Sequence, residues 1–168
     1  MVVEMSTVAD SSATIDESSL YIAGSFGKVV LGGTDAVTDN FGIGEQDIMS
    51  EEVTGTYTNA TIQSNAGENT YGADSDKVSY FAPAMGPLTV GVSYMDGGVA
   101  GDADSTSFGG KLAIGDNITV GYTNGIQEVS GAIDNESQNI GAKIALGDLT
   151  VIGAISKVEG ADEDIDTV

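Results

Sequence analysis

The residues best suited to chemistry are carboxylates gathered in one stretch without strand-like patterning, Thr34–Asp76. Six of these acids lie in its first and middle parts: Asp35, Asp39, Glu45, Asp47, Glu51 and Glu52. Rings of Asp or Glu select cations at the narrow points of channels. By charge alone, these residues are explained better by a solvated loop in an acidic protein than by a ring that selects cations. Their role therefore depends on what surrounds them. A long segment with no strands of its own is nevertheless unusual in a compact domain and is often functional.

Three lysines supply the opposite charge. Lys111 and Lys143 alternate with apolar residues and so share a face with Gly, Ser and Asn, and Lys77 does so less clearly. A lysine that faces lipid at mid-membrane costs about 2–4 kcal/mol, so in membrane-spanning strands these lysines would have to face water. They then form a sparse basic wall opposite the acids. An equally good explanation is that each lysine neutralises a carboxylate near a strand end.

Catalysis, metal binding and nucleic-acid binding are poorly supported. The 168 residues include no histidine and no cysteine, so no nucleophile–base pair can be proposed, and we expect neither an enzyme nor a cofactor. Acids at 96–104 and 162–166 could bind Ca²⁺ through clustered oxygens, but the spacing of a twelve-residue calcium loop is missing. The formal net charge of -21 repels phosphate backbones, which excludes nucleic acid as a partner.

The elements that must position these residues are strands, because the apolar residues repeat with period two. Leu88, Val90, Val92 and Tyr94 alternate with Thr, Gly and Ser, and three further segments show the same alternation: 107–114, 118–123 and 139–146. Each strand thus has one apolar face and one face of small or polar residues. The clearest helical signal is one short turn at Glu45–Glu52, and no apolar run reaches the 18 or so residues of a membrane helix.

The connections between the expected strands are of two kinds. Tight glycine-containing turns are expected at Ser25–Lys28, Met85–Pro87, Gly115–Asn117 and Gly147–Asp148. Long acidic stretches are expected at Thr34–Asp76, Gly97–Asp104, Gln127–Glu136 and Glu159–Asp166. Short turns at one end and long loops at the other are typical of an antiparallel up-and-down transmembrane β-barrel. The chain as a whole, 1–168, is therefore expected to belong to a single barrel domain.

Three other classes of protein share part of this pattern. A soluble β-sandwich also alternates, but its water-facing side should be rich in Lys, Glu and Thr rather than Gly, Ser and Ala. An extracellular acidic Ca²⁺-binding solenoid or surface-layer module should show a short repeat, and "DGGVAGDAD" at Asp96–Asp104 has no second copy in register. The third class is a closed eight-stranded barrel with a structural or adhesive role, and the long loop at Thr34–Asp76 counts against it.

Two segments resemble the Gram-negative general porins, especially those of alphaproteobacteria. They are "IDESSLYIAGSFGKVVLGGTD" at Ile15–Asp35 and "DKVSYFAPAMGPLTVGVSY" at Asp76–Tyr94, each similar to a strand–turn–strand unit of the family. The stretch between them lies where the family has its constriction loop, which folds into the barrel. The family usually has an arginine after the Leu-Gly of the first unit, whereas this sequence has Gly33 and no arginine anywhere.

The resemblance implies a channel in the outer membrane of a Gram-negative bacterium, through which small hydrophilic solutes and ions diffuse passively. On this resemblance the chain would supply about eight or nine of the family's sixteen strands. Val2–Val8 resembles the tail of a strand already under way and Ile165–Val168 the approach to another, which favours a partial barrel. The loop at 34–76 would be the constriction, and outer-membrane lipid and two further copies in a homotrimer would be the partners. The missing arginines favour cations as the preferred ions.

Overall fold

The computed structural model describes residues 3–7, 15–44, 76–97, 103–128, 135–159 and 165–167. These residues form one antiparallel sheet in which every strand pairs with its neighbours in sequence order. The strands are β1 (Val3–Thr7), β2 (Ile15–Gly24), β3 (Gly27–Gly33), β4 (Asp76–Phe81), β5 (Leu88–Met95), β6 (Asp104–Ile114), β7 (Ile118–Glu128), β8 (Asn135–Leu146), β9 (Leu149–Glu159) and β10 (Ile165–Thr167). The described part of the chain therefore holds ten strands, with two short ones at the edges of the eight longer ones.

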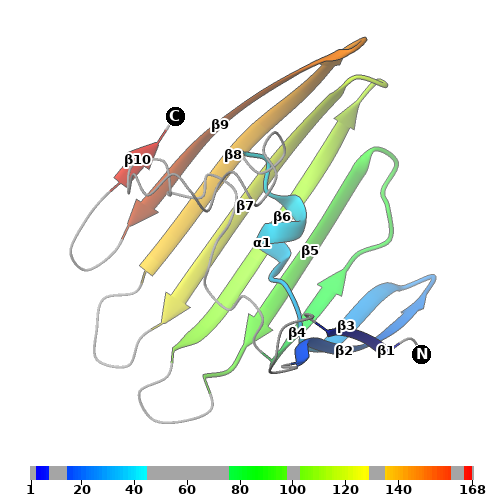
Figure 1. Ribbon diagram of the computed structural model, residues 1–168, viewed down its shortest axis with the longest axis vertical. Helices are drawn as coiled ribbons and strands as arrows, with labels where there is room; N and C mark the ends of the chain where they lie inside the picture. The colour runs from blue at the N-terminus through cyan, green and yellow to red at the C-terminus, as the bar shows by residue number, and fades with distance from the viewer. Residues whose placement is uncertain are drawn as a thin grey trace.

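The sheet is a meander with two unlike ends. Turns of two or three residues join β2 to β3, β6 to β7 and β8 to β9, whereas the other ends of these strands lead into longer connections. Gly115 and Gly147 begin two of these turns with φ of 61° and 64°, a left-handed conformation that suits glycine in hairpin turns. The sheet twists so strongly that β2 and β3 run at a steep angle to β8 and β9 (Figure 1). The expected meander is thus confirmed.

One short helix, α1 (Val37–Phe41), follows β3 and lies across one face of the sheet, where it contacts β5, β6 and β7 (Figure 1). Its first turn is closed by the carboxylate of Asp39, which accepts a hydrogen bond from the backbone N–H of Ala36 at 3.1 Å. The backbone N–H of Gly42 donates to the carbonyl of Thr38 at 2.7 Å where the helix ends. The helical turn expected at Glu45–Glu52 lies outside the described residues, and α1 was not predicted.

The apolar core is small and lies between α1 and the sheet. The buried apolar residues within the described ranges are Val30, Ala36, Val37, Phe41 and Ile43, four of which belong to the segment around α1. Within the same ranges, no helix has the length and apolar character needed to cross a membrane. The sheet is therefore stabilised chiefly by its ladders of hydrogen bonds and by α1 on one face.

Candidate functional site

The strand register separates two faces of opposite character. The first, the polar face, carries α1 and buries small polar side chains: Ser79, Ser93, Ser105, Ser107, Thr123, Asn139 and Ser156. The second, the apolar face, exposes large side chains: Ile22, Leu31, Val78, Tyr80, Val92, Tyr94, Phe108, Leu112, Ile114, Tyr122, Ile140, Leu146, Leu149, Val151 and Ile155. A soluble sheet would bury the large side chains, so an exposed apolar band of this extent points to lipid or another apolar partner.

Helix α1 is held to the polar face by a hydrogen bond at its first residue. The backbone N–H of Val37 donates to Ser93 Oγ at 3.2 Å, and the Ser93 hydroxyl in turn hydrogen-bonds to that of Ser107 on β6. At the other end of the helix, the rings of Phe41 and Phe81 pack at a tilt of 48° with their centroids 6.0 Å apart. Both ends of α1 are thus attached to strands that are distant from it in sequence.

The start of the segment after β3 is tied to the start of β4. Lys77 is only 5% exposed, and its Nζ donates a hydrogen bond to the carbonyl of Thr34. Thr34 follows β3 and Lys77 lies in β4, and these two strands pair directly. The contact therefore joins the two ends of the long stretch that was expected to be a loop.

A sheet with an apolar outer face, a polar inner face and a segment folded onto the polar face is the arrangement of a pore wall. The family model for the Gram-negative porin matches residues 1–168. The chain belongs to the Gram-negative porin family. The family resemblance inferred from the two strand–turn–strand segments is confirmed.

Membership of the porin family confirms three expectations: a transmembrane β-barrel, a location in the outer membrane, and a protein that is not an enzyme. Porins are transmembrane β-barrels of the outer membrane, so the apolar face is the lipid-facing side and the polar face lines the lumen. They are channels and not enzymes, in agreement with the expectation from the missing histidine and cysteine. No curated protein sequence matches the chain.

The lysines of this porin chain lie mostly on the polar face. Lys111 pairs with Gly121 and Lys143 lies two residues beyond Gly141, so both share the face that carries α1, and both are half-buried. Each lies four residues before a tight turn. Lys77 is on the same face but is buried, and its Nζ donates a hydrogen bond to the carbonyl of Thr34.

A fourth lumen-side lysine was missed from the sequence. Lys28 pairs with Phe81 and Ala23 and lies 4.9 Å from the ring centroid of Phe81 and 5.6 Å from that of Tyr21. Cation–π contacts of this length hold a lysine against aromatic rings. The sequence placed Lys28 in the expected turn Ser25–Lys28, whereas it is the second residue of β3. The alternation of Lys28, Val30 and Gly32 was the signal available in the sequence.

The candidate acids of the porin are only partly described. Asp35 is exposed immediately before α1, and Asp39 is half-buried with its carboxylate engaged at the helix start. Glu45, Asp47, Glu51 and Glu52 lie outside the described residues. Asp39 therefore has a structural task that the charge pattern did not reveal, whereas the side chain of Asp35 is exposed.

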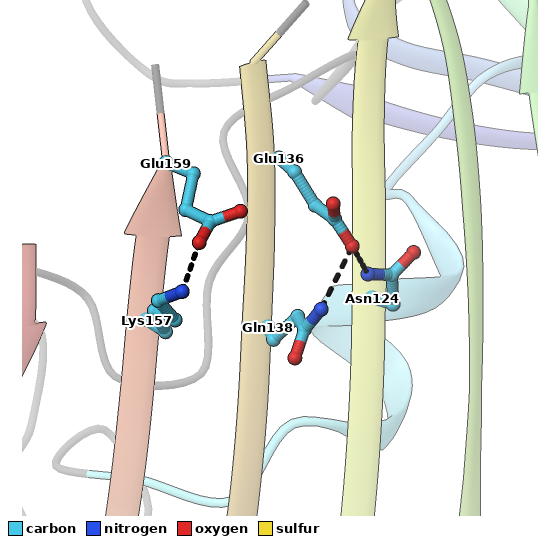
Figure 2. A network of polar contacts seen from close by, with 5 residues as sticks. All are labelled: Asn124, Glu136, Gln138, Lys157 and Glu159. Atoms are coloured by element: carbon cyan, nitrogen blue, oxygen red, sulfur yellow. Dashed lines mark hydrogen bonds and ion pairs between the residues drawn. The ribbon is translucent and has the colours of Figure 1, made fainter. Parts of the chain in front are cut away.

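The lipid-facing side ends in polar contacts at the loop end of β7, β8 and β9. Glu136 Oε1 accepts hydrogen bonds from Asn124 Nδ2 at 2.6 Å and from Gln138 Nε2 at 2.8 Å, and Lys157 pairs with Glu159 (Figure 2). These five residues share a face with Tyr122, Ile140 and Ile155, and they follow them toward the loops. Charged and amide groups would be costly in hydrocarbon, so this row marks the loop-side limit of the apolar band.

Calcium binding gains no support from the described part of the chain. Among these residues no group of three or more acids is placed to hold a metal ion. The Asp104 carboxylate accepts a hydrogen bond from the backbone N–H of Gly97 at 2.9 Å, which gives it a local structural role at the start of β6. Asp102 and the acids at 162–164 lie outside the described residues.

Proposed function

We propose that this porin chain forms the wall of a passive diffusion channel for small hydrophilic solutes and ions, with the stretch 34–76 as its constriction. The observation that supports the constriction is the position of α1, which lies on the lumen face and not at its rim. A segment seated there reduces the cross-section through which solutes pass. Passage is driven by concentration and needs no bound cofactor.

The channel prefers cations. Support comes from the charge balance of the chain, with 26 acidic residues, 5 lysines and no arginine. Asp35 is exposed beside the lumen face, and Glu45, Asp47, Glu51 and Glu52 belong to the same stretch. Negative charge along the lumen raises the local concentration of cations and lowers that of anions. Lys111 and Lys143 act as a sparse basic wall across from these acids.

Planar-bilayer recording tests both parts of the proposal. Native protein should give stepwise, long-lived openings, and a KCl gradient should give a reversal potential that favours K⁺. A variant with Glu45, Asp47, Glu51 and Glu52 changed to Gln or Asn should shift the reversal potential toward Cl⁻. Asp148→Asn, in the tight turn between β8 and β9, removes a carboxylate at the opposite end of the strands and serves as the control.

Each outcome of the recording has a separate meaning. Openings that favour Cl⁻ in the native protein would keep the channel and refute the role of the four acids. A shift in Asp148→Asn about one quarter as large, in proportion to the one carboxylate removed against four, would mean that total charge, and not the stretch 34–76, sets the preference. Failure of the detergent-folded native protein to form openings would refute the channel itself.

We also propose a homotrimer as the functional assembly, on the basis of the family. The apolar face offers an exposed band over β2–β9 that a neighbouring copy could cover in part. Mass measurement of the detergent-extracted native protein tests this: a mass of three chains supports the trimer, and a single-chain mass after mild extraction refutes it.

A further inference from the structure

Four glycines lie beneath the segment that follows β3. Gly91 on β5 pairs with Gly109 on β6, and Gly121 on β7 pairs with Gly141 on β8. All four are on the lumen face, and all four are buried. Glycine inside a strand weakens the strand, and it is often found where another part of the backbone approaches closely. The four therefore need an explanation beyond the sheet itself.

The approaching backbone is that of Phe41–Ile43. A Cβ atom added at Gly121 would lie 2.6 Å from the carbonyl oxygen of Phe41, and one added at Gly141 would lie 2.7 Å from Ile43 Cβ and closer still to the Ile43 carbonyl oxygen. At Gly91 and Gly109 an added Cβ would lie 3.0 Å from atoms of the Phe41 side chain, and 3.0–3.1 Å from a backbone oxygen of the neighbouring strand. Ordinary contacts of a Cβ begin near 3.4 Å, so no side chain fits at Gly121 or Gly141 as the segment now lies, and one at Gly91 or Gly109 fits only if its neighbours move by a few tenths of an ångström.

At Gly121 and Gly141 an added side chain would displace the segment rather than the sheet. Strands β6, β7 and β8 are hydrogen-bonded on both sides, which restrains their backbone against local displacement more than the segment is restrained. The contacts at Gly121 and Gly141 are to backbone atoms of Phe41 and Ile43, which cannot rotate away as a side chain could. Reaching an ordinary 3.4 Å contact requires a shift of about 0.8 Å at Gly121 and a larger one at Gly141, and the direction away from the sheet is toward the lumen.

We propose that Gly91, Gly109, Gly121 and Gly141 are the aperture-setting residues of this channel. Because these glycines lack side chains, Phe41–Ile43 can lie directly against the sheet. The distance between this segment and the sheet then sets how far the constriction projects into the lumen. The solute size limit then depends on side-chain volume at four positions that need not touch the solute. This inference rests on the proposed channel function, and it makes the wall, as well as the loop, a determinant of size selection.

Gly121→Ala and Gly141→Ala test the proposal, with Gly153→Ala as the matched control. Gly153 also lies inside a strand, but on the apolar face, and an added Cβ there meets nothing within 4 Å. Single-channel conductance and the largest sugar admitted into protein-containing liposomes should both fall in Gly121→Ala and Gly141→Ala. The double variant should lose more than either single variant, whereas Gly153→Ala should equal the native protein.

Amide hydrogen exchange on the same samples separates failure of the inference from failure of the channel. The backbone N–H of Val37 donates to Ser93, so lifting the segment should speed its exchange in Gly121→Ala and Gly141→Ala but not in Gly153→Ala. Unchanged or increased conductance in the two variants, from protein that forms native channels, would overturn the aperture-setting role. If the native protein forms no channel, the proposed function fails. Unchanged amide exchange at Val37 in the two variants would then also refute the close contact between Phe41–Ile43 and the glycines.

Discussion

Substitutions at Gly153 can show by their effect on stability which face of the sheet meets lipid. It lies in the middle of β9 on the apolar face, midway between Leu149 at the tight turn and Lys157 at the polar edge. An added Cβ at Gly153 meets no atom within 4 Å, and the position faces outward from the apolar face, so a substitution there chiefly changes the contact with the surroundings. We expect Gly153→Arg to destabilise the folded protein in a bilayer strongly.

The magnitude follows from the depth of Gly153. From Leu149 to Lys157 the strand spans about 26 Å, which at a tilt of about 40° covers roughly 20 Å of membrane thickness. The apolar band of such barrels is about 25 Å tall, so Gly153 lies close to its middle. An arginine at the bilayer midplane costs about 2–4 kcal/mol, which lowers the folding equilibrium constant roughly 30- to 700-fold.

Reversible urea unfolding in phospholipid vesicles measures this free energy. Gly153→Leu is the control for size, and it should be neutral or stabilising because it adds apolar surface against lipid. Leu149→Arg is the control for depth, and it should cost about 0–1 kcal/mol, after allowance for the lost leucine, because it lies near the interface. Equal stability of Gly153→Arg and Gly153→Leu in vesicles would refute the assignment of the apolar face to lipid.

Three further changes probe the lumen face. Ser93→Ala removes the partner of the buried Val37 N–H, so amide exchange at Val37 should rise roughly 5- to 150-fold, as expected for about 1–3 kcal/mol; unchanged exchange would contradict the contact. Lys77→Met leaves the carbonyl of Thr34 without its ammonium donor, and calorimetry or urea unfolding in vesicles should show a loss of about 1–3 kcal/mol, with no loss counting against this anchor. Lys111→Glu should shift the reversal potential in a KCl gradient further toward K⁺; a shift toward Cl⁻ would refute its place on the lumen wall.

The sheet could be predicted because its two surroundings impose a strict period of two. Lipid requires large apolar side chains on one face, and a crowded polar interior favours Gly, Ser and Asn on the other, so residues such as Val92 and Ser93 fall on opposite sides without ambiguity. The same alternation placed Lys111 and Lys143 on the polar face. Turn positions followed from glycines such as Gly115 and Gly147, whose left-handed conformation ends one strand and starts the next.

Helix α1 could not be predicted because local preferences do not produce it. Ala36 at its start has no side chain that can cap, and Val37 and Thr38 are β-branched and weak helix formers. Five residues are also too few for a helix to be stable alone. The helix exists because the sheet provides Ser93 for its first N–H and a surface for Phe41, and both partners lie far away in the sequence.

Charge was the least reliable guide to the site, because it says nothing about what a carboxylate or ammonium group already contacts. Asp39 and Lys77 looked like members of an acidic ring and a basic wall, yet one closes the first turn of α1 and the other binds a backbone carbonyl. Glycine proved more informative once the register was known. Read along the chain, Gly121 and Gly141 only weaken two strands, but across the sheet they pair directly beneath Ile43. Residues that shape a pore in this way carry no functional group, so only the approach of the opposing backbone shows why a side chain is absent there.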